Sequence, residues 1–271
     1  MNKNKKIKTF IYHIINVLIA FVFIFPIYYI IITSFKTERE IGTNVSIWLS
    51  QPIVTNYYET FTKYNIGPAL YSSMIVAIFA TIIGVIIGSM SAYVINRYDQ
   101  KKLAFTILTT MMIPYVVCAI PLFILFQKIG WFDTYSGLIL SHLIITVPQS
   151  VWILLGFVKG IPKEIEEAAL VDGCTKYGLF YKIVFPLLKG GIVAAATLGF
   201  IMSWNNFSLA LMLGGSKIVP APLALFNFVG EAAINWGGLA ASATLMLIPT
   251  IVFTLWVQKY LTQGLMVGAI Q

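Results

Sequence analysis

Long apolar runs alternate with short polar stretches along the whole 271-residue chain. About 20 consecutive apolar residues are needed to cross the hydrocarbon core of a bilayer as an α-helix, and runs of this length recur throughout the sequence. The pattern therefore predicts an all-α polytopic membrane protein with six spans, at roughly 10–34, 68–95, 103–127, 134–158, 184–213 and 238–260.

Composition supports a membrane protein and orients it. Hydrophobic residues make up 59% of the chain and charged residues 10%, whereas a soluble domain carries about a quarter charged residues. With six spans, both termini lie on one side of the membrane. All lysines and arginines fall on that side except Lys36, Arg39, Lys63, Lys128 and Lys217. The positive-inside rule then predicts cytoplasmic termini, and it explains the net charge of +8 without any nucleic-acid partner.

The chain reads as one membrane domain with short ends. Residues 1–9 form a basic cytoplasmic tail, residues 10–262 the six-helix domain, and residues 263–271 a C-terminal cytoplasmic tail. The first apolar run is too long for a signal peptide and no small-residue cleavage site follows it, so we expect a retained helix.

The sequence offers no chemistry of its own. Cys118 lies within the third span and Cys174 in a cytoplasmic loop, so we expect no disulfide between them. No Cys/His spacing fits a metal site. His142 is expected to be a satisfied core residue. There is no phosphate-binding loop, so we expect no catalytic residue, no bound cofactor and no ATP hydrolysis in this chain.

The cytoplasmic loop at 159–183 is too elaborate for a simple connection. Pro162 fits the first turn of a helix, acidic residues follow where they complement the helix dipole, and Gly173 fits a helix end. The acidic residues are Glu164, Glu166, Glu167 and Asp172. The loop therefore predicts a short helix, a glycine turn and a second helix.

This predicted helix presents two small residues, Ala168 and Ala169, with acids around them. Small side chains permit close approach, so the helix could enter a groove of a partner protein while its acids meet basic groups at the rim. The alternative is an amphipathic helix lying on lipid headgroups. Its acidic character argues against that, because interfacial helices are usually basic on their polar face.

The same residues resemble a known motif. The run Glu167-Ala168-Ala169, then Gly173, Ile183 and Pro186, resembles the EAA loop of ABC importer permeases. Further stretches look like the carbohydrate-uptake branch that includes the smaller maltose-permease subunit: Ser34-Phe35-Lys36 with a following acid, Asn56-Tyr57, Trp204-Asn205-Asn206-Phe207 and Gly264–Ile270. The chain departs from that branch at Asn206, where an acid is frequent, and by stopping at Gln271 without a lysine and glycine.

The resemblance implies a multi-pass subunit of a bacterial plasma membrane importer for a sugar or short oligosaccharide. It implies a second permease chain that completes the pore, two ATPase subunits that bind ATP and Mg²⁺, and an extracytoplasmic solute-binding protein. The implied coupling element comprises Glu166, Glu167, Ala168, Ala169, Asp172 and Gly173. Within it, Glu167 would pair with a basic ATPase residue and Asp172 would support the turn.

Two spans carry small residues at every fourth position. These residues are Gly84, Gly88 and Ala92 in the second span, and Gly191, Ala195 and Gly199 in the fifth. Such spacing lets helix backbones approach closely. The ladders predict either packing within the chain or a face for a partner permease.

Polar residues inside spans are costly and mark candidate solute pathways. The strongest group is Trp204, Asn205 and Asn206, in which two amides and an indole could bind a sugar ring. Hydrogen bonding between helices is the alternative role for such amides. Gln149 and Tyr115, each following a proline expected to kink its helix, are weaker candidates.

Other function classes remain open on the sequence alone. A permease of the same superfamily for a polyamine is one alternative, although a polycation would favour acids in the fifth span. An ion-coupled secondary carrier is another, although the spans show neither an acid–base relay nor an inverted repeat. A membrane enzyme would need a paired acid and base, which is absent from the sequence.

Overall fold

The computed structural model describes residues 3–43, 46–230 and 233–268. Within these residues the regular secondary structure is helical, apart from one isolated β-bridge between Val229 and Ile234. The chain divides into two compact units, residues 1–66 with 225–248, and residues 67–224 with 249–271. Most of the Gly264–Ile270 stretch is described only as backbone, and residues 269–271 lie outside the described residues.

The first unit contains α1 (Lys3–Thr33), two short helices, α2 (Glu38–Thr43) and α3 (Thr55–Thr62), the 3₁₀ turn η3 (Leu225–Phe228) and the start of α14 (Trp236–Gly268). From Thr9 onward, α1 is apolar and exposed within the chain. Its end is fixed by polar contacts. Asn56 Nδ2 donates to the carbonyl oxygens of Ser34 (2.9 Å) and Lys36 (2.8 Å), and the Ser34 and Tyr57 hydroxyls lie 2.7 Å apart.

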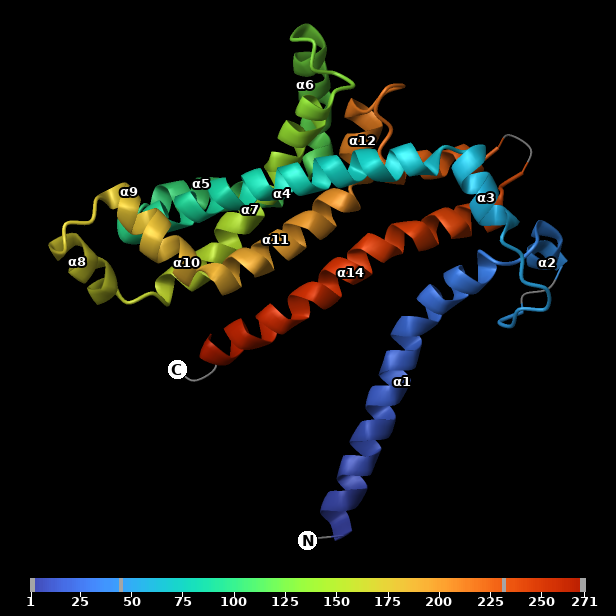
Figure 1. Cartoon of the computed structure of the whole chain (residues 1–271), viewed down its shortest axis with the longest axis horizontal. Coiled ribbons are helices and arrows are strands. Elements are labelled where there is room, and N and C mark those ends of the chain that lie inside the picture. The colour runs from blue at the N-terminus through green and yellow to red at the C-terminus, as the bar shows by residue number, and fades with distance from the viewer. Residues whose placement is uncertain (1–2, 44–45, 231–232, 269–271) are drawn as a thin grey trace. The chain divides into compact units, whose positions relative to one another are not determined.

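The second unit contains the helices that carry the candidate site (Figure 1). They are α4 (Ile66–Arg97), α5 (Lys101–Thr109), α6 (Tyr115–Lys128), α7 (Tyr135–Lys159), α8 (Lys163–Val171), α9 (Lys176–Leu179), α10 (Phe185–Leu187), α11 (Lys189–Trp204), α12 (Phe207–Leu213) and α13 (Ala221–Ala224). The 3₁₀ turn η1 (Thr110–Met112) follows α5, and the π-helical segment η2 (Phe180–Val184) joins α9 to α10.

Four described helices are long and apolar enough to span a membrane: Thr9–Thr33, Ile66–Arg97, Tyr135–Lys159 and Trp236–Leu255. Two further candidates are bent pairs. Lys101–Met112 meets Tyr115–Lys128 at 95°, and Lys176–Leu187 meets Lys189–Trp204 at 75°. The number of spans is therefore four, or six if each bent pair is one span.

The spans predicted at 103–127 and 184–213 are each formed by a bent pair of helices. A kink was expected after Pro114, whereas the bend in the second of these spans was not. The first breaks at Ile113, which has an extended backbone (ψ 122°), as expected for a residue before proline. The second starts earlier, at Lys176, bends at Leu188 and breaks again at Asn205 before α12. In contrast, α7 continues through Pro148.

Small residues bring the long helices of this unit into close contact. A side chain at Gly84 would collide with Thr146, and one at Gly88 with Ser150, so α4 lies directly against α7. A side chain at Gly191 would come within 2.6 Å of the Phe157 ring.

The other ladder residues also face the interior of the unit. Ala92 and Ala195 are fully buried in one apolar cluster, and a side chain at Gly199 would lie 3.6 Å from Thr81. Both ladders therefore make contacts within the chain.

We expect Gly88→Ala to destabilise the protein by about 1–3 kcal/mol, because the added methyl group overpacks the contact with α7. The midpoint of thermal unfolding of the purified protein in detergent measures this. Gly156→Ala is the matched control, since Gly156 lies within α7 as Gly88 lies within α4, but among the described residues nothing comes within 4 Å of a side chain added there, and alanine favours helix. Equal midpoints for the two variants would contradict the close α4–α7 contact.

Candidate functional site

The loop between α7 and α11 forms the predicted helix and glycine turn. Helix α8 starts after Pro162, which occupies the N-cap position rather than the first helical turn. It ends at Val171 with Asp172 as its C-cap, and Gly173 follows with a φ of +85°. This is the left-handed region that glycine adopts without a steric penalty.

The end of α8 is a Schellman motif, in which two backbone hydrogen bonds close the last turn. The N–H of Cys174 donates to the Ala169 carbonyl oxygen (2.9 Å), and the N–H of Gly173 donates to that of Leu170 (3.1 Å). Asp172 takes part through its backbone N–H, which donates to the Ala168 carbonyl oxygen (3.0 Å). The α8 helix is therefore a defined structural element with a fixed exit direction.

Two of the nine residues of α8 face the interior of the second unit. Ala169 is 8% exposed and joins the apolar cluster formed with Leu179, Phe180 and the end of α7. Glu166 is 6% exposed. The prediction that both alanines face outward was therefore wrong for Ala169, because the i, i+3 spacing places it on the same side of the helix as Glu166.

The outward face of α8 combines acids with apolar side chains. Glu164, Glu167 and Ala168 are exposed, and Val171 is 87% exposed. Tyr177, after the turn, is 79% exposed. Figure 1 shows α8 and α9 at one end of the second unit, beyond the last turn of α7.

The carboxylate of Glu166 is held by the end of α4. Arg97 donates to Glu166 Oε1 from Nε (2.6 Å) and approaches it with Nη2 (2.5 Å), while the Tyr93 hydroxyl donates to Oε2 (2.9 Å). Arg97 Nη2 also donates to the Ile161 carbonyl oxygen (2.8 Å). We call Tyr93, Arg97 and Glu166 the α4–α8 clamp.

The clamp was missed by sequence reasoning. Arg97 follows the second apolar run and was assigned only an orienting role under the positive-inside rule, and Tyr93 was read as part of the span. The available signal was an arginine at the last turn of a span together with an acid in a loop on the same side of the membrane.

The candidate pathway residues do not form one cluster of exposed polar groups. Trp204 is 1% exposed and packs near Phe200, whose ring stacks on Phe253. Asn206 is buried and caps α12, with its Oδ1 accepting from the Leu209 N–H (2.9 Å). Asn205 is exposed and donates to the Ile201 carbonyl oxygen.

The other two candidates lie in different surroundings. Gln149 is buried in α7, and neither of its side-chain polar atoms has a hydrogen-bond partner among the described residues. Tyr115 is exposed at the start of α6, after the bend. His142, expected to be satisfied, is only half so: its Nδ1 lies 2.6 Å from Ser203 Oγ, while its Nε2 has no partner in the described part of the chain.

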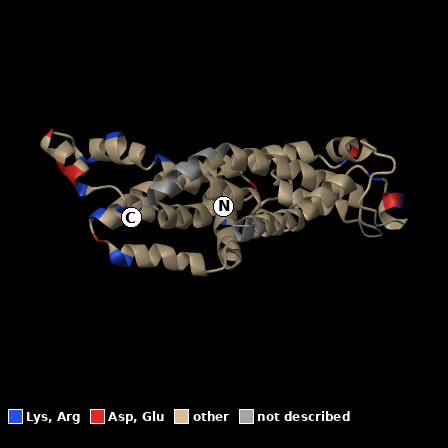
Figure 2. Ribbon diagram, turned by 90° about the horizontal axis from the view of Figure 1, so that it is seen from below, with Lys and Arg blue, Asp and Glu red and all other residues tan. Residues whose placement is uncertain are grey.

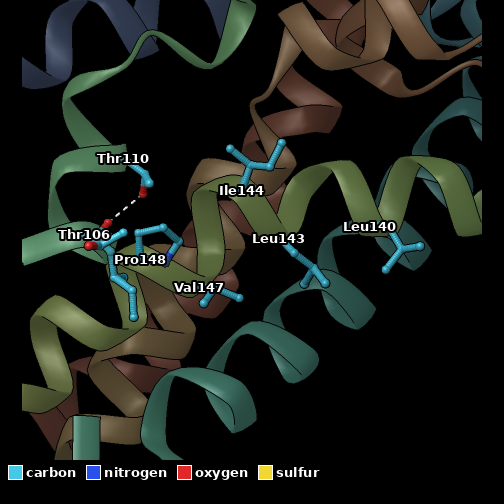
Figure 3. Close-up of a pocket in the computed structure, with 8 residues that line it drawn as sticks. Thr106, Thr110, Leu140, Leu143, Ile144, Val147 and Pro148 are labelled. Atoms are coloured by element: carbon cyan, nitrogen blue, oxygen red, sulfur yellow. Dashed lines mark hydrogen bonds between the residues drawn. The ribbon is translucent and has the colours of Figure 1, made fainter. Parts of the chain in front are cut away.

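An apolar cavity of about 420 Å³ lies between α5, η1 and α7 (Figure 3). Its lining residues are Thr106, Ile107, Thr110, Leu140, Leu143, Ile144, Val147 and Pro148. The two threonine hydroxyls already donate to backbone oxygens of their own helical turns. A polar ligand needs convergent polar groups, so this cavity is not suited to one.

We expect Asn206→Ala to lower the free energy of unfolding by about 1 kcal/mol, because it removes the N-cap of α12, whereas Asn206→Asp keeps a capping oxygen. Thermal midpoints of the two variants, with Asn205→Ala as the exposed control, measure this. If Asn206→Ala instead raised the KM for the transported solute without lowering the midpoint, Asn206 would be a solute contact rather than a cap.

Comparisons with known proteins identify the relatives of this chain. The family model described as "Binding-protein-dependent transport system inner membrane component" matches residues 84–267. The chain is 36% identical over 222 residues to the trehalose transport system permease protein SugB of Mycobacterium tuberculosis, covering 80% of this chain and 81% of the relative. It is 30% identical over 269 residues to the trehalose/maltose transport system permease protein MalG of Thermococcus litoralis, covering 94% of each.

A solved structure has the same fold over nearly the whole chain. It is a chain of a bacterial ABC transporter involved in the import of the acidic polysaccharide alginate, with a TM-score of 0.81 and 18% sequence identity. The match covers 96% of this chain and 98% of that one.

Proposed function

Because the chain belongs to the family of binding-protein-dependent transport system inner membrane components, we propose that it carries a carbohydrate across the membrane and that α8 couples it to a separate ATPase, the motor of transport. The chain is a permease subunit of an ABC importer in the bacterial inner membrane.

The observation that carries the coupling role is the outward face of α8. Glu167, Ala168 and Val171 are exposed on a helix whose opposite face is bound to the chain itself. A groove with apolar walls and a basic rim in a separate ATPase subunit would match this face. We propose that Glu167 pairs with a basic residue there and that ATP and Mg²⁺ bind to the ATPase subunits.

We propose six spans, with each bent pair crossing once, and cytoplasmic termini. Basic residues support this orientation, because Lys101, Lys159, Lys176 and Lys189 are the first or last residues of α5, α7, α9 and α11, at the ends that our six-span topology places on the cytoplasmic side. Figure 2 shows charged residues on α8 and the turns beside it, whereas the adjoining lengths of helix carry almost none. By the positive-inside rule this end of the second unit is cytoplasmic.

A second permease chain, a pair of ATPase subunits and an extracytoplasmic binding protein complete the proposed assembly. The family description names a binding protein. The exposed apolar surface of α1, which has a mean hydropathy of 2.6, is available to lipid and to the second permease.

A carbohydrate is favoured over a polyamine as the solute. The names of SugB and MalG specify trehalose and maltose. The buried polar residues of the spans, such as Gln149, Ser203 and Asn206, are neutral. Neutral amides and hydroxyls suit sugar hydroxyls, whereas a polycation would need acids in the pathway.

We expect Glu167→Lys to abolish co-purification of the ATPase subunits with the tagged chain, because the substitution places like charges at the docking rim. The chain should still insert at wild-type levels. Glu59→Lys, the same change in an acid of α3 outside the spans, is the control. Normal ATPase recovery and transport with Glu167→Lys would contradict the docking role of α8.

We expect the partner binding protein, purified from its native host, to release a neutral sugar that mass spectrometry can identify. ATP-driven uptake of that labelled sugar into proteoliposomes holding the complete complex should be inhibited by the unlabelled sugar and not by spermidine. Release of a polyamine, with inhibition by spermidine, would replace the carbohydrate with the alternative solute.

A further inference from the structure

We propose that the α4–α8 clamp is the rigid link through which displacement of α8 reaches the membrane-spanning helices, so that Glu166 positions α8 on its own chain rather than on the motor. This inference rests on the proposed function of α8. It assigns opposite roles to two neighbouring glutamates, with Glu166 facing inward and Glu167 facing outward.

The geometry of the clamp gives it stiffness. The side chains of Arg97 and Glu166 are 10% and 8% exposed, so the pair is shielded from water and from salt. Both carboxylate oxygens are engaged, one by Arg97 and the other by the Tyr93 hydroxyl. Charge-assisted hydrogen bonds of this kind have narrow distance and angle limits, whereas apolar contacts tolerate sliding.

Arg97 holds the segment before α8 as well as the helix itself. Its Nη2 donates to the Ile161 carbonyl oxygen, two residues before the start of α8, while Nε donates to Glu166 within the helix. One guanidinium therefore grips two points separated along the loop. The planar guanidinium fixes the directions of both hydrogen bonds, whereas the rotatable ammonium of a lysine does not.

The clamp joins α8 to a helix that is itself tightly packed. Tyr93 and Arg97 occupy the last two turns of α4, and the Tyr93 ring lies 5.5 Å from that of Phe180. Farther along α4, Gly88 and Gly84 lie directly against α7. A displacement at Glu166 is thus applied to the end of α4 and passed along a helix that lies directly against α7 at Gly88 and Gly84.

Removal of one partner leaves a charge buried without compensation, which is strongly unfavourable. The inward face of α8 would then be held to the second unit chiefly by Ala169, which packs in the apolar cluster with Leu179 and Phe180. The outward face with Glu167 is unaffected, so the motor should still bind. The expected defect is motion of α8 that no longer moves α4.

The test uses the complete complex in proteoliposomes and measures three quantities: co-purification of the ATPase, ATP hydrolysed, and solute transported. We expect Glu166→Gln to retain the ATPase and its hydrolysis but to lower the solute moved per ATP about five-fold or more. Arg97→Lys, which keeps the charge and loses the fork, should lower the same ratio. Exchange of the two charges in Arg97→Glu with Glu166→Arg should restore part of it.

An exposed position outside α8 provides the matched control. Asp99→Asn removes an exposed acid two residues beyond Arg97. This variant should leave the ratio unchanged. If Glu166→Gln inserts poorly, Arg97→Lys provides the decisive measurement, because it buries no unpaired charge.

The outcomes separate the clamp from the docking role. Wild-type ratios in both Glu166→Gln and Arg97→Lys would overturn the clamp. Loss of the ATPase in Glu166→Gln, or an equal loss of coupling in Asp99→Asn, would also overturn it. A lowered ratio of solute moved per ATP in the clamp variants supports the clamp, whatever the result for Glu167→Lys. If Glu167→Lys keeps its ATPase, only the proposed docking through Glu167 is wrong.

Discussion

Helices that meet in a lipid bilayer cannot gain free energy by expelling water, so their association depends on how closely their surfaces fit. In the second unit, this constraint is met by glycine. Gly84 and Gly88 allow α4 to approach the backbone of α7, and Gly191 of α11 leaves room for the Phe157 ring of α7. The resulting group of α4, α7 and α11 is the frame on which the rest of the unit is built.

The polar end of this frame is held by different forces. Besides its contact with the apolar cluster, α8 is attached to α4 through the carboxylate of Glu166, which accepts hydrogen bonds from Arg97 and Tyr93. A buried ion pair adds little net stability compared with apolar packing, but it fixes geometry, because an unpaired charge there is costly. A loop built this way has one orientation. Its outward face is consequently presented in one direction only.

The sequence predicted the nature of α8 but not its orientation. Pro162, the acids and Gly173 indicated a short helix with a glycine end, and the Schellman bonds at Ala169 and Leu170 agree with that. The two adjacent glutamates are chemically identical in the sequence. The contact with α4 is what turns Glu166 inward, and this contact joins positions almost 70 residues apart.

The bends are a second case in which local signals were insufficient. Pro114 indicated a kink, yet the size of the turn, 95°, depends on where α6 packs, against α7 and α12. The proline in α7 indicated a kink as well, but α7 runs through Pro148. In the same helix, Gln149 and His142 are buried with side-chain atoms that have no hydrogen-bond partner among the described residues, which no periodicity could have indicated.

By itself, the sequence determined the apolar helices, their approximate ends, the distribution of charge and the glycine-terminated helix, because each follows from interactions between residues close along the chain. The tertiary structure decided which side of α8 faces outward, which asparagine caps a helix and which glycines touch a neighbour. Those features arise from contacts between distant segments, and the pairing of distant segments is set by shape and burial rather than by local residue pattern.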